Sequence, residues 1–146
     1  MADPITWTVL ESVKTRLASI TLGNGYRTNA GLTVTLEPEQ IPEGADDSVL
    51  AVVLDSLQKP EDPALRRIGR SAVIAIYAKL ACEMDDRQRR LHDILADIDQ
   101  AMANGHKDFA VGTAFPQFLD AQAIPAAEGM KWTGAVVRYS TAVRLR

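Results

Sequence analysis

A nearly unbroken apolar stretch, followed directly by an amphipathic one, constrains the fold of this chain most. Residues 71–81 read SAVIAIYAKLA and are rich in β-branched side chains, which is typical of a central strand covered on both faces. From about Met84 to Ala103 the apolar residues recur at spacings of three and four, which places them on one side of a helix. They are Leu91, Ile94, Leu95, Ile98, Ala101 and Met102. A strand followed by such a helix forms a two-layer unit.

A second amphipathic helix is predicted at the N-terminus. Asp3 is expected to be its N-cap residue and Pro4 its first helical residue. The carboxylate can accept hydrogen bonds from free backbone N–H groups, and proline lacks a donor that would be unpaired there. Gly23 and Gly25 are expected to end this helix. Its apolar stripe consists of Val9, Leu10, Val13, Leu17 and Ile20.

Segments with alternating side chains predict the remaining strands. Residues 32–36 alternate apolar residues with threonine, which indicates one solvated face, whereas residues 49–57 are apolar on both faces. A turn or sheet edge is expected at Phe115–Pro116, and a short strand follows at residues 118–119. Residues 131–146 form a long last strand, either an edge protected by arginines or a face shown to a partner.

Together these elements predict the α+β fold class, in a single domain spanning residues 1–146. The expected architecture is a mainly antiparallel sheet of about four to five strands, packed against the N-terminal helix and the long central helix. A chain of 146 residues with 47% hydrophobic and 24% charged residues can bury the core that this arrangement needs.

The composition argues against several classes of partner. A net charge of -3 and an aromatic content of 5% do not suit a general nucleic-acid binder, which usually carries excess lysine and arginine or stacking aromatic side chains. The single cysteine, Cys82, has no second cysteine to pair with, which favours a reducing, cytosolic setting. We expect no signal peptide and no membrane-spanning segment.

No residue pattern predicts a catalytic, cofactor or metal site. The GNGY segment at residues 23–26 follows a helix and lacks the further residues of a phosphate-binding loop. His92 and His106 have no partner at ligand spacing, and Cys82 is expected to be a buried, unreactive thiol. We therefore predict that the protein is not an enzyme. A small enzyme of unrecognised type remains an alternative, which a pocket of convergent carboxylates with shifted pKa values would favour.

Charged clusters provide the candidate interface residues. Residues 37–47 contain five carboxylates and two prolines, which predicts an acidic loop. Its spacing does not match a calcium-binding loop, although clustered carboxylates can hold a hard cation. Arginines gather before the central strand and recur on the last strand. Each cluster is either a solvated surface or a contact surface for another subunit or partner. The candidates are Glu37, Glu39, Glu43, Asp46, Asp47, Arg66, Arg67, Arg70, Arg138 and Arg144.

The order of these elements resembles the tail terminator and tail-completion proteins of long-tailed bacteriophages and prophages. The resemblance extends over nearly the whole chain and depends on arrangement rather than on a motif. The segments that carry it are LASITLGNGY at 17–26, the strand at 32–36, SAVIAIYAKLA at 71–81, LHDILADIDQAM at 91–102 and GAVVRYSTAV at 134–143. Since that family has no catalytic signature, the resemblance implies no site residues.

The resemblance implies a structural protein of the virion tail, assembled in the cytoplasm of the host bacterium. Such a protein forms a ring, commonly a hexamer, which caps the finished tail tube, stops its polymerisation and docks to the head connector or head-completion protein. DNA would pass through the ring, where exposed arginines can meet it. A head–tail joining protein or another minor tail component is the alternative within the same machinery.

Ring assembly suggests a use for the charged clusters. Each subunit of a closed ring needs two different, complementary surfaces. We therefore expect the acidic loop at residues 37–47 to face one of the arginine groups across subunits, either Arg66, Arg67 and Arg70 or Arg138 and Arg144.

Overall fold

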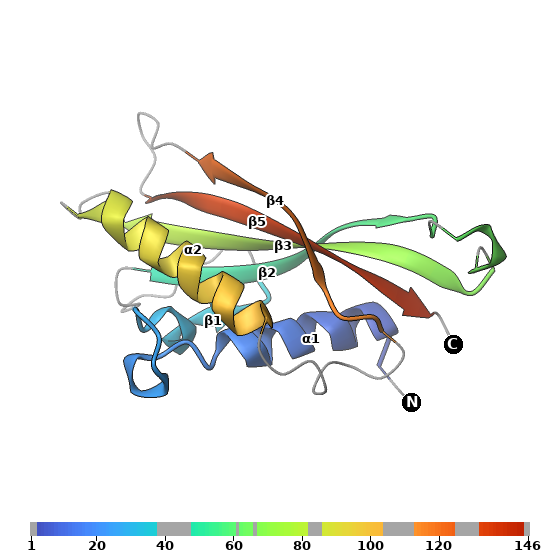
Figure 1. The fold of residues 1–146 in the computed structure, drawn as a ribbon, viewed down its shortest axis with the longest axis horizontal. Coiled ribbons are helices and arrows are strands. Elements are labelled where there is room, and N and C mark those ends of the chain that lie inside the picture. Colours follow the sequence, from blue (N-terminus) through green and yellow to red (C-terminus); the bar gives the residue numbers. More distant parts are fainter. Residues whose placement is uncertain are drawn as a thin grey trace.

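The chain forms one five-stranded sheet with two helices packed on it (Figure 1). The computed structural model describes residues 3–37, 48–60, 62–65, 67–81, 86–103, 113–124 and 132–144. The helices and strands are α1 (Ile5–Leu17), β1 (Val34–Thr35), β2 (Ser48–Gln58), β3 (Gly69–Ala81), α2 (Arg87–Ala103), β4 (Gln117–Ile124) and β5 (Trp132–Arg144). This architecture confirms the predicted α+β fold class.

The strand order is β1-β2-β3-β5-β4. β1 runs parallel to β2, and the other neighbouring strands are antiparallel. β3 lies at the centre, pairing with β2 on one side and with β5 along its whole length on the other. This position explains the apolar run at residues 71–81, because Ile74 and Ile76 join the helix-packed core while Val73 and Ala75 are buried on the other face.

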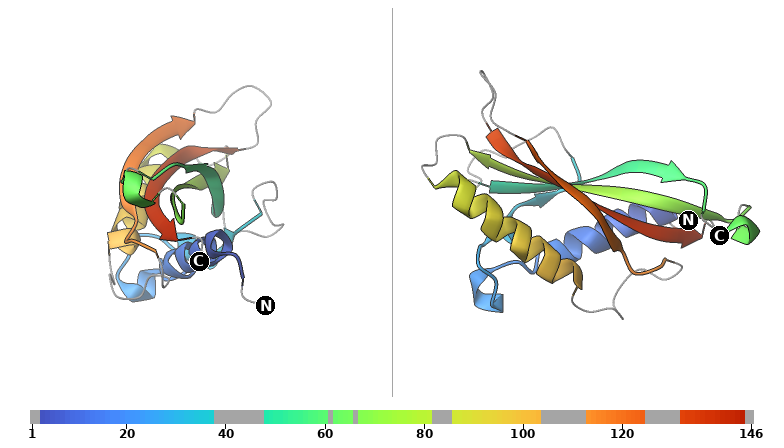
Figure 2. Two further views of the ribbon diagram at one scale, coloured as in Figure 1. Left: turned by 90° about the vertical axis from the view of Figure 1, so that its right-hand side faces the viewer. Right: turned by 45° about the horizontal axis from the view of Figure 1, so that its top comes forward.

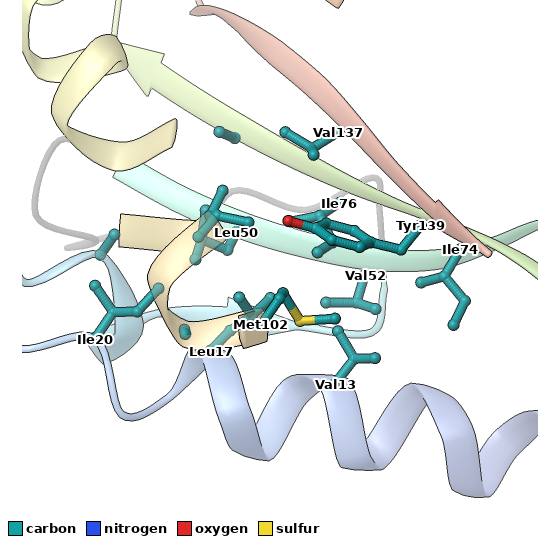
Figure 3. Packing of buried hydrophobic residues seen from close by; sticks show 14 of the residues in the cluster. Val13, Leu17, Ile20, Leu50, Val52, Ile74, Ile76, Met102, Val137 and Tyr139 are labelled. Atoms are coloured by element: carbon teal, nitrogen blue, oxygen red, sulfur yellow. The ribbon is translucent and has the colours of Figure 1, made fainter. Parts of the chain in front are cut away.

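Both described helices pack on the same face of the sheet, where they enclose the main core (Figure 2). Val13 and Leu17 of α1 and Met102 of α2 lie opposite the strand residues Val52 and Tyr139 (Figure 3). The predicted stripes of both helices are buried, with Leu95 partly so. Helix and strand periodicities therefore converge on a single core.

The ends of α1 differ from the prediction. Pro4, rather than Asp3, occupies the N-cap position, and no side chain caps the helix there. The helix also ends at Leu17, several residues before Gly23, and the N–H groups of Ser19 and Ile20 then donate to Arg16 and Leu17 in i→i−3 hydrogen bonds that close its last turn. Gly25 instead follows the 3-10 turn Leu22–Asn24, with a left-handed φ of 87°. Glycine adopts that conformation at little cost.

The sheet edges also differ from the prediction. The edge alternative for the last strand is wrong, because β4 pairs with β5 and makes β5 an interior strand. β4 is longer than the short strand expected after Phe115–Pro116. β1 has only two residues, which pair with Leu50 and Ala51. No described strand pairs with the outer edge of β2 beyond Ala51. In the same region the hairpin of β2 and β3 extends past the helices (Figure 1).

No helix in the described part of the chain is both long enough and apolar enough to cross a bilayer.

Candidate interaction surfaces

The face of the sheet opposite the helices carries small buried residues between long polar ones. Ala51 and Ala75 are fully buried on this face, yet they lie outside the helix-packed core. Their register neighbours include Tyr77 beside Ala51 and Arg138 beside Ala75. Lys79 lies on the same face, and its burial lowers the pKa of its ammonium group. Long side chains with alanines between them can lie flat and cover the backbone.

Arg138 ties three strands together on this face. Its guanidinium donates to Asp120 on β4, with Nη1 and Oδ1 3.1 Å apart, and its Nε lies 3.6 Å from Asp55 Oδ2 on β2. The small side chain of Ala75, which pairs with Arg138 in the register, lets the arginine reach across β3. The hydrogen bond to Asp120 raises the pKa of the guanidinium, so Arg138 stays charged. This predicted interface residue is therefore engaged within its own subunit.

Three other predicted arginines, Arg67, Arg70 and Arg144, lie at the end of the sheet where β3 begins and β5 ends. Arg67 and Arg144 are exposed, and Arg70 is half-buried. The register pairs Arg70 with the core residue Val143 and places Arg144 opposite Gly69, so Arg70 and Arg144 occupy opposite faces of the sheet. They do not form one basic patch.

Of the predicted acidic residues, Glu37 is the one that the structure describes. It is exposed just after β1, and its backbone N–H donates to Thr35 Oγ1 over 3.0 Å. The remaining candidates fall outside the described residues; they are Glu39, Glu43, Asp46, Asp47 and Arg66.

The two edges of the sheet carry exposed apolar side chains that the sequence prediction did not select. On β4, Phe118 is 55% and Leu119 48% exposed. On the outer half of β2, Leu54 is 37% and Leu57 46% exposed. All residues of β4 except Ile124 are exposed. The signal available in the sequence was the run QFLDAQAI, whose single charge is unusually little for an edge strand.

A hollow of about 390 Å³ lies where the first turns of α2 meet the segment after α1. Arg27, Arg89 and Arg90 line it together with Asp86 and Asp93, and Arg89 Nε lies 3.5 Å from Asp93 Oδ1. Guanidinium and carboxylate groups thus nearly balance there, as is common on a solvated surface. Among the described residues, the pKa is shifted for the side chains of Lys79, Arg138 and Tyr139, and none of them lines this hollow.

A buried carboxylate on α2 connects two parts of the fold. Asp97 is fully buried and accepts hydrogen bonds from the backbone N–H groups of Arg27 and Thr28, over 3.0 and 2.9 Å, and from Thr28 Oγ1 over 2.7 Å. Asp97 lies between Ile94 and Ile98 on the buried side of the helix. An acidic residue within an apolar stripe was the sequence signal for this contact, and the sequence prediction overlooked it.

In the parts of the chain that the structure describes, no three histidine, cysteine, aspartate or glutamate residues gather as metal ligands would. His92 is exposed on α2. No protein-family model and no curated protein sequence matches this chain.

Proposed function

We propose that this chain is a ring-forming tail terminator of a long-tailed bacteriophage or prophage. In this role, copies of the chain form a ring, six as the family resemblance implies, on the last ring of the tail tube. The ring stops further polymerisation of the tube and provides the docking surface for the head connector. A head–tail joining protein or another minor tail component is the second candidate, because it would need the same kind of subunit.

The observation that carries this proposal is the one-sided packing of the sheet. Both described helices cover one face, while the other face and two unlike edges carry no described helix or further strand. A ring subunit needs two different lateral surfaces and further surfaces for the proteins above and below it. The order of helices and strands, which underlies the resemblance to tail terminators, agrees with this use.

The charged segments fit a head-to-tail contact in one way. Glu37 follows β1 at one side of the sheet, and Arg144 ends β5 near the other side. A contact between these two sides brings the acidic segment toward Arg144 of the neighbour. Arg138 suits this role less, because Asp55 and Asp120 already engage it. We also propose Arg144, which is exposed on the face without helices, as an arginine that meets DNA within the ring.

Capping of tail tubes tests the proposal directly. The purified chain is added to the tail-tube protein encoded in the same genome, and tube lengths are measured by electron microscopy. We expect the chain to bind one tube end and to stop elongation at substoichiometric amounts. Binding to an isolated head connector but not to tube ends would favour the head–tail joining alternative. Binding to neither would overturn the proposed role.

A further inference from the structure

One row of side chains crosses β2, β3, β5 and β4 on the face that the helices cover. In the register, Leu54 of β2 pairs with Ile74 of β3, Ile74 with Tyr139 of β5, and Tyr139 with Phe118 of β4. The two inner residues are buried, at 0% and 4% exposure, whereas the outer two are 37% and 55% exposed. The apolar row therefore continues to both edges of the sheet and is unfinished at each end.

The two edges match in length and direction. Four successive rows of the sheet contain a residue of each edge: Val52 with Ala121, Val53 with Asp120, Leu54 with Phe118, and Ser56 with Gln117. The register shift of each edge is adjacent to the row of Leu54 and Phe118, at Asp55 on one side of that row and at Leu119 on the other. β2 and β4 also run in opposite directions, because three antiparallel pairings separate them.

β4 and the outer half of β2 lack the lysine and proline that commonly protect an edge strand, although each carries one irregularity in the register and one aspartate. Edge strands are commonly protected by lysine or proline, or are covered by another segment. β4 contains no lysine, arginine or proline, and its one charge, Asp120, is held by Arg138. No described residue pairs with the outer side of β4 or with the outer side of β2 beyond Ala51.

From these observations we infer that β4 of one copy pairs antiparallel with the outer half of β2 of the next copy. The two five-stranded sheets then become one continuous sheet. The partner is thus a second copy of this chain, and the inference rests on the proposed ring-forming function, which it makes specific. Two different edges meet head to tail, an arrangement that closes into a ring when the rotation between copies is suitable.

The inferred pairing buries what each edge leaves open. It supplies backbone partners to the outer N–H and C=O groups of both strands. On the helix-covered face it brings Phe118 against Leu54 and Leu57 of the next copy, which completes the apolar row. On the opposite face it brings Asp120 near the neighbour's Asp55, and this like-charge approach costs free energy that Arg138 of each copy partly offsets.

Lysine substitutions at the two edges, with one control elsewhere, test the inference. Phe118→Lys alters the β4 edge, and Leu57→Lys alters the β2 edge. Leu22→Lys is the matched control, because Leu22 is 58% exposed on the 3-10 turn after α1 and belongs to neither edge. Since Phe118 also contacts the Tyr139 ring edge to face, with centroids 5.9 Å apart, Leu119→Lys serves as a second β4 variant if Phe118→Lys folds poorly. Circular dichroism checks the fold of each variant.

Sedimentation velocity then gives the assembly state. We expect the wild type and the Leu22→Lys control to associate beyond the dimer, and each edge variant to be monomeric, with self-association weakened at least about tenfold. An equimolar mixture of the β4-edge and β2-edge variants is expected to form heterodimers and nothing larger. Each variant retains one intact edge, so the mixture can build a single interface.

Several outcomes would overturn the inference. One is that both edge variants have the same mass in solution as the wild type. Another is that the β2-edge variant forms a dimer by itself, which would indicate pairing of β4 with β4. The third is a wild type that is monomeric at about 1 mM. The tube-capping assay separates this result from the proposed function. Edge variants that still cap tubes as well as the wild type would refute the edge pairing and leave the terminator role intact. If the mixed edge variants form heterodimers but the wild type caps no tube, the edge pairing is supported and the terminator role is refuted.

Discussion

Among single side chains, Asp97 has the clearest structural role. Its carboxylate is fully buried and satisfies three donors of Arg27 and Thr28, so it fixes the segment after α1 to the middle of α2. Hydrogen bonds to a charged acceptor are stronger than neutral ones, and a buried donor that loses its partner costs about 1–3 kcal/mol. The contact is therefore expected to contribute more to stability than the ion pair between Arg89 and Asp93 on the same helix.

Replacing Asp97 tests this role. We expect Asp97→Ala to lower the free energy of unfolding by about 3 kcal/mol, because it leaves buried donors unpaired. Asp93→Ala is the control on the same helix, and its loss should stay below about 1 kcal/mol, since the ion pair to Arg89 is largely exposed. Urea denaturation followed by circular dichroism measures both. Equal losses for the two variants would show that the buried carboxylate has no special role.

Tyr139 gives a prediction about alkaline stability. Its hydroxyl donates to Asp99 Oδ1 over 2.7 Å, and burial, the hydrogen bond and the nearby carboxylate all raise the pKa of the phenol above its ordinary value of about 10. The folded state thus keeps a proton that the unfolded chain loses. The stabilisation is complete below pH 10 and decreases as the pH rises above it, by up to about 1.4 kcal/mol per pH unit.

The variant Tyr139→Phe removes the titrating group. We expect it to be less stable than the wild type by about 1 kcal/mol at pH 7, where the hydrogen bond to Asp99 is lost. Between pH 10 and 11.5 this difference should shrink or reverse. Tyr77→Phe, on the other face of the sheet, retains Tyr139 and should keep the alkaline loss of the wild type. Parallel curves for wild type and Tyr139→Phe across this range would contradict the prediction.

Among strands, the close approach of β3 and β5 requires a glycine at position 134. A Cβ atom placed on Gly134 would lie 1.7 Å from the backbone oxygen of Ala78. Backbone atoms of a central strand cannot move aside without disturbing the pairing on both sides. We therefore expect Gly134→Ala to destabilise the fold by at least about 3 kcal/mol.

Gly23→Ala provides the matched control for this substitution. Its added Cβ would meet its nearest atom, Thr21 Oγ1, at 4.0 Å, which is an ordinary contact distance. The change in unfolding free energy is therefore expected to stay within about 0.5 kcal/mol. Thermal unfolding measures both variants. A Gly134→Ala protein as stable as the control would mean that β3 and β5 are farther apart than described.

The elements that the sequence predicted well are those with a complete local pattern. The continuous apolar run of β3 identifies a strand that is buried on both faces. The apolar stripe of α2, at helical spacing, identifies a helix and its buried side. Which strands pair could not be predicted in this way, because pairing depends on residues distant in sequence. Nothing within the last strand itself indicates that β4 returns to cover its edge. The N-cap of α1 was predicted at Asp3 with Pro4 as the first helical residue, whereas Pro4 itself occupies the N-cap position.

In the candidate surfaces, too, contacts between residues distant in sequence could not be predicted from local patterns. Arg138 was predicted as a candidate interface residue on the last strand. Its partners Asp55 and Asp120 come from β2 and β4, and only the order of strands in the sheet brings them within reach. Phe118 and Leu57 were unremarkable in the sequence, because an apolar residue in a strand is usually assumed to be buried.

For the molecule as a whole, the two ideas about its assembly make opposite predictions about salt. A contact between the acidic segment beginning at Glu37 and Arg144 of the next copy depends on charge, and such attraction is screened when the Debye length falls from about 10 Å at 0.1 M salt to about 3 Å at 1 M. Pairing of β4 with β2 depends on backbone hydrogen bonds and apolar burial. Salt would even favour it slightly by screening Asp120 from the neighbour's Asp55.

We therefore expect self-association to persist at 1 M NaCl, with a dissociation constant within about threefold of its value at 0.1 M. Light scattering across a salt series measures this, with Arg144→Glu compared at each concentration. If pairing of β4 with β2 provides most of the free energy of association, Arg144→Glu associates nearly as well as the wild type at both salt concentrations. Dissociation of the wild type at high salt, together with loss of association by Arg144→Glu at low salt, would assign the ring contact to the charged segments instead.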